Sequence, residues 1–256
     1  MTWSRREWLA AVAATLGAAF APRAAQAFGE SSDFSVGLLE YDAPAWNPRP
    51  NALYRVLREL EQTTSILTAQ NETIVRPTAE ALWDCPLLVV AGDRGFDPWP
   101  DADRNALALW LAAGGTLLVD GSEGRDDGEF DAAIRRELDA IVPGHAVEVV
   151  PDEHVVYRSF YLVDGAPGRE QVTTDLYGVT FDDRLAVIIN HNDIMGALER
   201  DGLGAWAYEV HPGGQRQRDM AMRFAVNVAM YALCLDYKAD QVHVPFLLDR
   251  RRWRVD

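Results

Sequence analysis

The sequence predicts an α/β fold in which helices flank a mostly parallel β-sheet. Three continuous apolar runs, at 86–92, 116–121 and 184–190, are typical of strands that are buried on both faces. Segments with apolar residues at helical spacing alternate with strand-like segments along the first half of the chain. This alternation favours parallel strands joined by helices, and we expect a single compact domain that covers residues 28–256.

The first half of the chain supplies most of the predicted elements. FSVGLLEY at 34–41 predicts a strand, and the next segment, 50–64, has Leu53, Val56, Leu57 and Leu60 on one helical face. Further along we expect a strand at 65–69, a helix at 77–84, a strand at 86–92, a helix at 101–115 that ends at two glycines, and a strand at 116–121.

The pattern is looser after residue 121, where a polar loop begins. In this half we expect a helix at 130–142, a strand at 154–165 that ends in a turn, a buried strand at 184–190, and a long helix at 216–235.

The amino terminus has the three parts of a secretory signal peptide. Arg5 and Arg6 form the charged start, an alanine-rich apolar run covers 8–21, and Ala25-Gln26-Ala27 is a small-x-small cleavage site. The pair of arginines, followed by Trp8 and Leu9, resembles the twin-arginine (Tat) export signal. We therefore predict a signal peptide at 1–27 and a periplasmic protein, with an uncleaved anchoring helix as the alternative.

The chain is acidic, with a formal net charge of −15 at pH 7. Removal of residues 1–27 takes away three arginines and one glutamate, which makes the net charge −17. Such a surface repels nucleic acid and anionic lipid, so we predict no nucleic-acid partner. The sequence beyond the signal peptide predicts no membrane span.

The carboxyl ends of parallel strands are the usual place for a ligand, because helix N-termini and loops meet there. Polar residues follow several predicted strands, and the candidate crevice consists of Tyr41, Asp93, Asp120, Ser122, His154, Arg158, Asn192 and Asp193. The opposite charges of Arg158 and Asp193 predict either an ion pair that orders the crevice or a site for a ligand carboxylate or phosphate.

No cofactor motif is present in the sequence. It contains neither GxGxxG nor GxxxxGKS/T, so we expect no nucleotide cofactor. The GSEG segment at 121–124 lacks the spacing of a nucleophile elbow, and Ser122 is a weak nucleophile candidate. The five histidines are scattered, and we predict no metal site, although a set of Asp120 and Asp193 with either His154 or His191 stays open as an alternative.

The two cysteines, Asn227 and Tyr231 are expected to have structural rather than catalytic roles. Cys85 and Cys234 lack metal-site spacing and are interpreted as small buried hydrophobic residues, with a disulfide bond as the alternative. Asn227 and Tyr231 lie among apolar residues of the long helix, where a buried amide must find partners. We expect Asn227 to hold a neighbouring loop.

Four segments resemble a bacterial envelope family known as domain of unknown function 4159. They are GDRGFDPWPDADRNALALWLAAGGTLLVDG (92–121), HVVYRSFYLVDG (154–165), YGVTFDDRLAVIINHNDIMGALERD (177–201) and RQRDMAMRFAVNVAMYAL (216–233). The resemblance implies a class I glutamine amidotransferase-like, flavodoxin-like fold. It also implies an envelope protein partner, because relatives resemble modules of membrane proteins with von Willebrand A-type domains.

Amidotransferases of that fold use a cysteine at a strand-to-helix elbow, and neither cysteine of this chain matches that position. We therefore predict an exported, non-catalytic module that binds a ligand or takes part in envelope assembly. The alternative is a periplasmic hydrolase or metal-dependent enzyme that uses Asp93, Asp120, His154 and Asp193 at the strand-end crevice.

Overall fold

A seven-stranded sheet forms the centre of the computed structural model, which describes residues 33–69, 71–181 and 183–252, with side chains as far as residue 234. The predicted signal peptide at 1–27 lies outside the described residues. The strands stand in the order β2-β1-β3-β4-β7-β6-β5. Their bounds are β1 Val36–Leu39, β2 Thr73–Val75, β3 Leu87–Gly92, β4 Thr116–Gly121, β5 Glu148–Val149, β6 Tyr177–Phe181 and β7 Arg184–Asn190.

Five neighbouring strands, from β2 to β7, run parallel, and β6 and β5 add antiparallel pairs at one edge. The central strands β3, β4 and β7 are the three continuous apolar runs, and almost every residue in them is buried. The prediction of a mostly parallel sheet flanked by helices is therefore confirmed.

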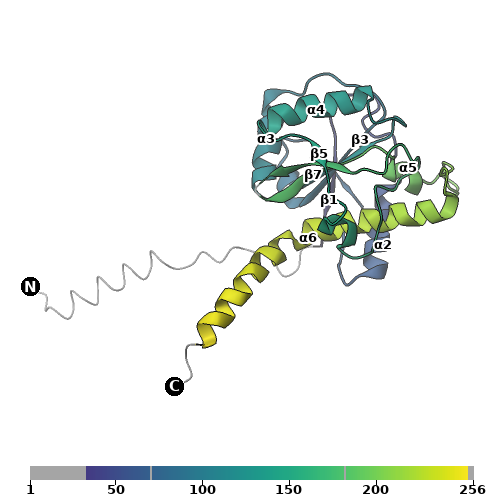
Figure 1. The fold of residues 1–256 in the computed structure, drawn as a ribbon. Helices are drawn as coiled ribbons and strands as arrows, with labels where there is room; N and C mark the ends of the chain where they lie inside the picture. The colour runs from purple at the N-terminus through teal and green to yellow at the C-terminus, as the bar shows by residue number, and fades with distance from the viewer. Residues whose placement is uncertain (1–32, 70, 182, 253–256) are drawn as a thin grey trace, which may run out of the picture. The chain divides into compact units, whose positions relative to one another are not determined.

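Helices cover both faces of the sheet, as Figure 1 shows: α3 and α4 lie on one side, and α2 and α6 on the other. The α-helices are α2 Leu53–Thr63, α3 Asp101–Ala112, α4 Glu129–Ile141, α5 Ile194–Leu198 and α6 Gly214–Arg252, and the 3₁₀ helices are η1 Glu80–Asp84 and η2 Val155–Arg158.

Each face of the sheet has its own hydrophobic core. One core packs β-strand residues against α2, α5, α6 and η2, and Phe224 of α6 is fully buried in it. The other core packs strand residues against α3 and α4, with Phe130 and Trp110 at its centre. Alternate residues of one strand enter opposite cores, because successive strand side chains point to opposite faces; Val89 joins the first core and Val90 the second.

Several predicted elements differ from the structure. Residues 65–69 form no strand of the sheet, although Thr68 makes an isolated parallel bridge with Phe34. The helix expected at 77–84 is the short 3₁₀ helix η1. The strand expected at 154–165 is wrong: this segment begins with η2, whose residues Val156 and Tyr157 pack beneath α6 in the first core. A short apolar run can be buried as either a strand or a helical turn, because both remove its side chains from water.

Candidate functional site

The strands β1, β3, β4 and β7 are parallel, so their carboxyl ends lie side by side at one end of the sheet. We call this end of the strands the carboxyl edge. The expected crevice residues Asp120, Ser122, Asn192 and Asp193 all lie at this edge, within or directly after β4 and β7. All four are buried, with Asp120 and Asn192 completely inaccessible to water. Six of the eight candidate residues lie at this edge: these four, and also Tyr41 and Asp93, which follow β1 and β3.

Asp193 is the centre of the carboxyl edge. It follows β7 in the left-handed backbone region, with φ of 60°, and its Oδ1 accepts a hydrogen bond of 2.8 Å from Gly196 N at the start of α5. Any other residue at position 196 would clash with this carboxylate, because its Cβ atom would lie 2.1 Å from Asp193 Oδ2. The glycine thus lets the carboxylate cap the helix at close range.

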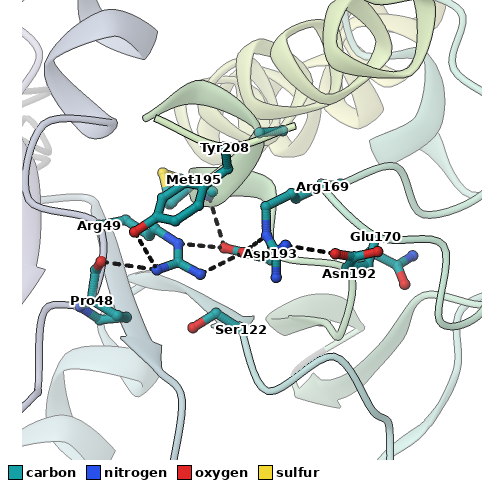
Figure 2. Close-up of polar contacts among 12 residues, drawn as sticks. Pro48, Arg49, Ser122, Arg169, Glu170, Asn192, Asp193, Met195 and Tyr208 are labelled. Carbon is teal, nitrogen blue, oxygen red and sulfur yellow. Dashed lines mark hydrogen bonds and ion pairs between the residues drawn. The ribbon is translucent and has the colours of Figure 1, made fainter. Parts of the chain in front are cut away.

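Two arginines from distant loops bind the same carboxylate, as Figure 2 shows. Arg49 donates from Nε to Oδ1 at 3.1 Å and from Nη2 to Oδ2 at 2.8 Å, while Arg169 donates from Nε to Oδ2 at 2.6 Å. The Asp193 side chain is 1% exposed and that of Arg49 10%. Bidentate guanidinium pairs of this kind are among the stronger charged hydrogen bonds.

Tyr208 completes this group, which we call the Asp193 cluster: Arg49, Arg169, Asp193 and Tyr208. The ring centroid of Tyr208 is 4.3 Å from the Arg49 guanidinium carbon and 5.6 Å from that of Arg169. Its hydroxyl oxygen accepts a hydrogen bond of 3.2 Å from Arg49 Nη1. Burial lowers the pKa of Arg49, but the hydrogen bond and charge of Asp193 outweigh it and leave the pKa raised.

Asp120, at the end of β4, is a second carboxyl group beside the Asp193 cluster. Its two oxygens accept hydrogen bonds of 2.8 Å from Ile194 N and Met195 N in the first turn of α5. Burial raises the pKa of the Asp120 carboxyl, and the nearby charge of Asp193 raises it further. Both acidic groups therefore bind the amino terminus of α5.

Ser122 and Asn192 are also engaged with the backbone. The Ser122 hydroxyl donates to Gly92 O at 2.9 Å, so it joins the loops after β4 and β3. Asn192 Oδ1 accepts hydrogen bonds from Val172 N at 2.8 Å and Thr173 N at 3.1 Å. A serine nucleophile needs a hydrogen-bonded base, and this hydroxyl is bound to a carbonyl oxygen instead.

Tyr41 and Asp93 lie at the same edge but outside the Asp193 cluster. The Tyr41 hydroxyl donates to Ala91 O at 2.9 Å, and burial together with the charge of Asp93 raises its pKa. Asp93 pairs with the exposed Arg94 at 2.7 Å, and this hydrogen bond lowers the pKa of the Asp93 carboxyl.

His154 and Arg158 do not join the other candidates. The His154 ring is 5.6 Å from the ring of Tyr231, whose hydroxyl accepts a hydrogen bond from Leu185 N near the start of β7, at the opposite edge of the sheet. Arg158 donates to Asp152 O rather than to Asp193. The ion pair expected between Arg158 and Asp193 is therefore wrong, because Arg49 and Arg169 occupy the carboxylate.

Asn227 of α6, for which we expected a loop-holding role, contacts the segment after η2. Its Oδ1 accepts hydrogen bonds from Phe160 N at 3.1 Å and Tyr161 N at 2.7 Å, and its Nδ2 donates to Tyr161 O at 2.8 Å. This amide therefore fixes Tyr161 against the helix.

Sequence reasoning missed the partners of Asp193. Arg49 lies 144 positions away in the chain, in a proline-containing loop before α2, and no local pattern distinguishes it from other arginines. His191 is another buried residue at this edge: its Nε2 is 2.8 Å from Asp131 Oδ1 on α4, and its Nδ1 has no hydrogen-bond partner within the part of the chain that the structure describes. Asp131 also binds Arg135 at 2.6 Å, which ties the loop after β7 to α4.

The cysteines and metal-ligand residues form no reactive group in the described part of the chain. Cys85 and Cys234 are free, Cys85 buried and Cys234 half-buried, and burial followed by the charge of Asp84 raises the pKa of Cys85 to about 11. No three His, Cys, Asp or Glu side chains among the described residues come together in a way that could hold a metal ion.

A comparison with protein families matches residues 35–233 to a family described as a domain of unknown function (DUF4159). The chain belongs to this DUF4159 family. The match covers the whole sheet, the carboxyl edge and the first half of α6, so the Asp193 cluster lies inside the DUF4159 domain. No curated protein matches the chain. None of the helices described for this DUF4159 protein is both long and apolar enough to cross a membrane.

Proposed function

We propose that this DUF4159 protein is an exported, non-catalytic module that binds a ligand or an envelope protein partner. The supporting observation is that the polar side chains of the carboxyl edge are already bound to one another or to the backbone. Asp120 and Asp193 hold the first turn of α5, and the Ser122 hydroxyl binds a carbonyl oxygen. The Ser122 hydroxyl thus has a carbonyl oxygen where a serine nucleophile would need a base.

The amidotransferase-like class belongs to this proposal. A mostly parallel sheet covered by helices on both faces agrees with that fold class. The nucleophile of amidotransferases is a cysteine at a strand-to-helix elbow, whereas Cys85 precedes β3 and Cys234 lies within α6. The position argues against glutamine hydrolysis by this chain, and the raised pKa of Cys85 disfavours its thiolate.

Export by the Tat route is proposed from the twin-arginine segment alone. Its test is cell fractionation of the full chain in a bacterium with a Tat pathway, beside the variant with both Arg5 and Arg6 replaced by lysine. We expect periplasmic protein only with the arginine pair. Equal export of the two proteins would contradict the Tat route.

The absence of catalysis is tested by labelling the folded chain with a fluorophosphonate, which reacts with activated serine hydroxyls, and by measuring ammonia release from glutamine. We expect neither labelling nor ammonia. Labelling that disappears in Ser122→Ala, or ammonia release that disappears in Cys85→Ser, would overturn the proposal and identify the reacting residue.

A further inference from the structure

A pocket of about 330 Å³ lies between α2, α5 and the first half of α6, on the face of the sheet that α2 and α6 cover. We call it the arginine–tryptophan pocket; the residues that matter for its chemistry are Arg55, Leu198, Trp206, Arg218, Met222 and Arg223. Its volume is within the range of about 300–1,000 Å³ that is usual for small-molecule sites.

Three guanidinium groups surround one indole ring in this region. The ring centroid of Trp206 is 3.8 Å from the guanidinium carbon of Arg200, 4.1 Å from that of Arg218 and 5.3 Å from that of Arg55. Arg223 lies over the ring of Tyr161 at 5.5 Å. The aromatic faces hold the cations in place without neutralising them.

These arginines have no carboxylate at ion-pair distance among the described residues. Glu59 and Asp219 line the same pocket, but neither pairs with an arginine, and Asp219 accepts a hydrogen bond of 2.7 Å from Gln215. The Nε atoms of Arg55, Arg200 and Arg218 are buried and have no hydrogen-bond partner among the described residues, whereas the Nη atoms of Arg218 donate to Ala197 O and Tyr208 O. The charges of these arginines are therefore not balanced by a paired carboxylate in the part of the chain that the structure describes, and an anion in the pocket would balance them.

The electrostatics of the pocket favour an anion. Burial lowers the pKa of Arg55 and of Arg218, and the charge of Arg200 lowers both further, which measures the repulsion among the three cations. Three arginines and two carboxylates line the pocket, and Arg200 lies beside it over the ring of Trp206, in a protein whose net charge is −15. A local positive excess of this kind concentrates small anions at the site.

From these contacts we infer that the arginine–tryptophan pocket binds a small organic anion, with its carboxylate or phosphate group on Arg55 and Arg218 and its apolar part against Leu198, Met222 and Trp206. Guanidinium groups match the geometry of both anionic groups. This site goes beyond the proposed function, because it does not depend on whether the carboxyl edge performs chemistry.

The test is isothermal titration calorimetry of the full chain at low ionic strength with phenyl phosphate, benzoate and inorganic phosphate. We expect at least one of the two organic anions to bind with a dissociation constant on the order of 0.1 mM, and inorganic phosphate to bind more weakly. The stronger of the two organic probes identifies the anionic group that the pocket prefers.

Arg55→Gln is the informative variant, because the Nε of Arg55 has no hydrogen-bond partner among the described residues and we expect the fold to stay intact without its ring contact with Trp206. We expect it to weaken binding about tenfold, the loss of one charged hydrogen-bond pair. Arg58→Gln is the matched control: it makes the same change on the exposed side of the same helix, and binding should not change. Arg223→Gln, at an exposed pocket position, provides a second test.

Three results would overturn the inference. The first is the absence of binding by both organic anions up to about 10 mM, which is weaker than any specific site of this size. The second is equal affinity of the wild type, Arg55→Gln and Arg223→Gln. The third is that inorganic phosphate binds as tightly as phenyl phosphate. Leu198, Met222 and Trp206 would then contribute nothing to binding.

Discussion

The Asp193 cluster and the arginine–tryptophan pocket both gather arginines, and Tyr208 contacts both. Its hydroxyl accepts from Arg49, and its backbone oxygen accepts from Arg218 at 2.7 Å. In the cluster two guanidinium groups share the carboxylate of Asp193, whereas no carboxylate of the described residues is paired with the pocket cations. The difference teaches that arginines paired with a buried carboxylate stabilise the fold, whereas arginines without such a pair can bind the anionic group of a ligand.

The largest expected effect is that of Asp193→Asn. Asparagine tolerates the left-handed backbone and keeps an oxygen for Gly196 N, but it leaves Arg49 and Arg169 without their counterion. We expect the free energy of unfolding to fall by about 3 kcal/mol, measured by urea denaturation followed by circular dichroism.

Asp42→Asn is the matched control for this change. Asp42 also pairs with an arginine, Arg76, but its side chain is 80% exposed. Exposed ion pairs contribute little, so stability should hardly change. Equal losses in the two variants would mean that burial of the cluster does not determine its contribution.

A second pair of variants compares the two regions directly. Arg49→Met should lower the free energy of unfolding by about 2 kcal/mol, because it removes charged hydrogen bonds to a buried carboxylate. Arg55→Met should leave stability unchanged or raise it, because it removes a cation that burial and Arg200 disfavour. A comparable loss in Arg55→Met would show that the pocket arginines support the fold.

The last comparison concerns pH dependence, where the effect is small for each pH unit. Burial and Asp193 raise the pKa of Asp120, so the folded protein keeps a proton that the unfolded chain has released. The free energy of unfolding therefore falls as the pH rises from about 3.9 toward the raised folded-state value, by at most about 1.4 kcal/mol per pH unit. Urea denaturation across this range should give a flatter profile for Asp120→Asn than for the wild type. Parallel profiles would mean that Asp120 is ionised in the folded protein.

Much of the sheet could be predicted from the sequence because its central strands are continuous apolar runs. The runs at 86–92, 116–121 and 184–190 are β3, β4 and β7. The short elements β5, β6 and α5 were not predicted. α5 has only five residues, and its start depends on hydrogen bonds that its N–H groups donate to Asp120 and Asp193 rather than on helical periodicity.

The candidate site was predictable only in part, for a related reason. Asp120, Ser122, Asn192 and Asp193 follow buried strands, so strand position alone brings them to one edge. Arg49, Arg169 and Tyr208 come from loops, whose paths are set by the finished fold. His154 was expected there because its segment was interpreted as a strand, and the 3₁₀ helix η2 places it at the other edge.

The composition of the Asp193 cluster has a consequence for the order in which the protein is made. β1 to β4 come from the first half of the chain, whereas Asp193 and Tyr208 come from the second. A growing chain that has reached residue 121 has Arg49 without a carboxylate and Asp120 without the N–H donors of α5. The cluster can form only after residue 208 has been added, so an unfinished chain differs from a finished one in unpaired charge as well as in exposed apolar surface.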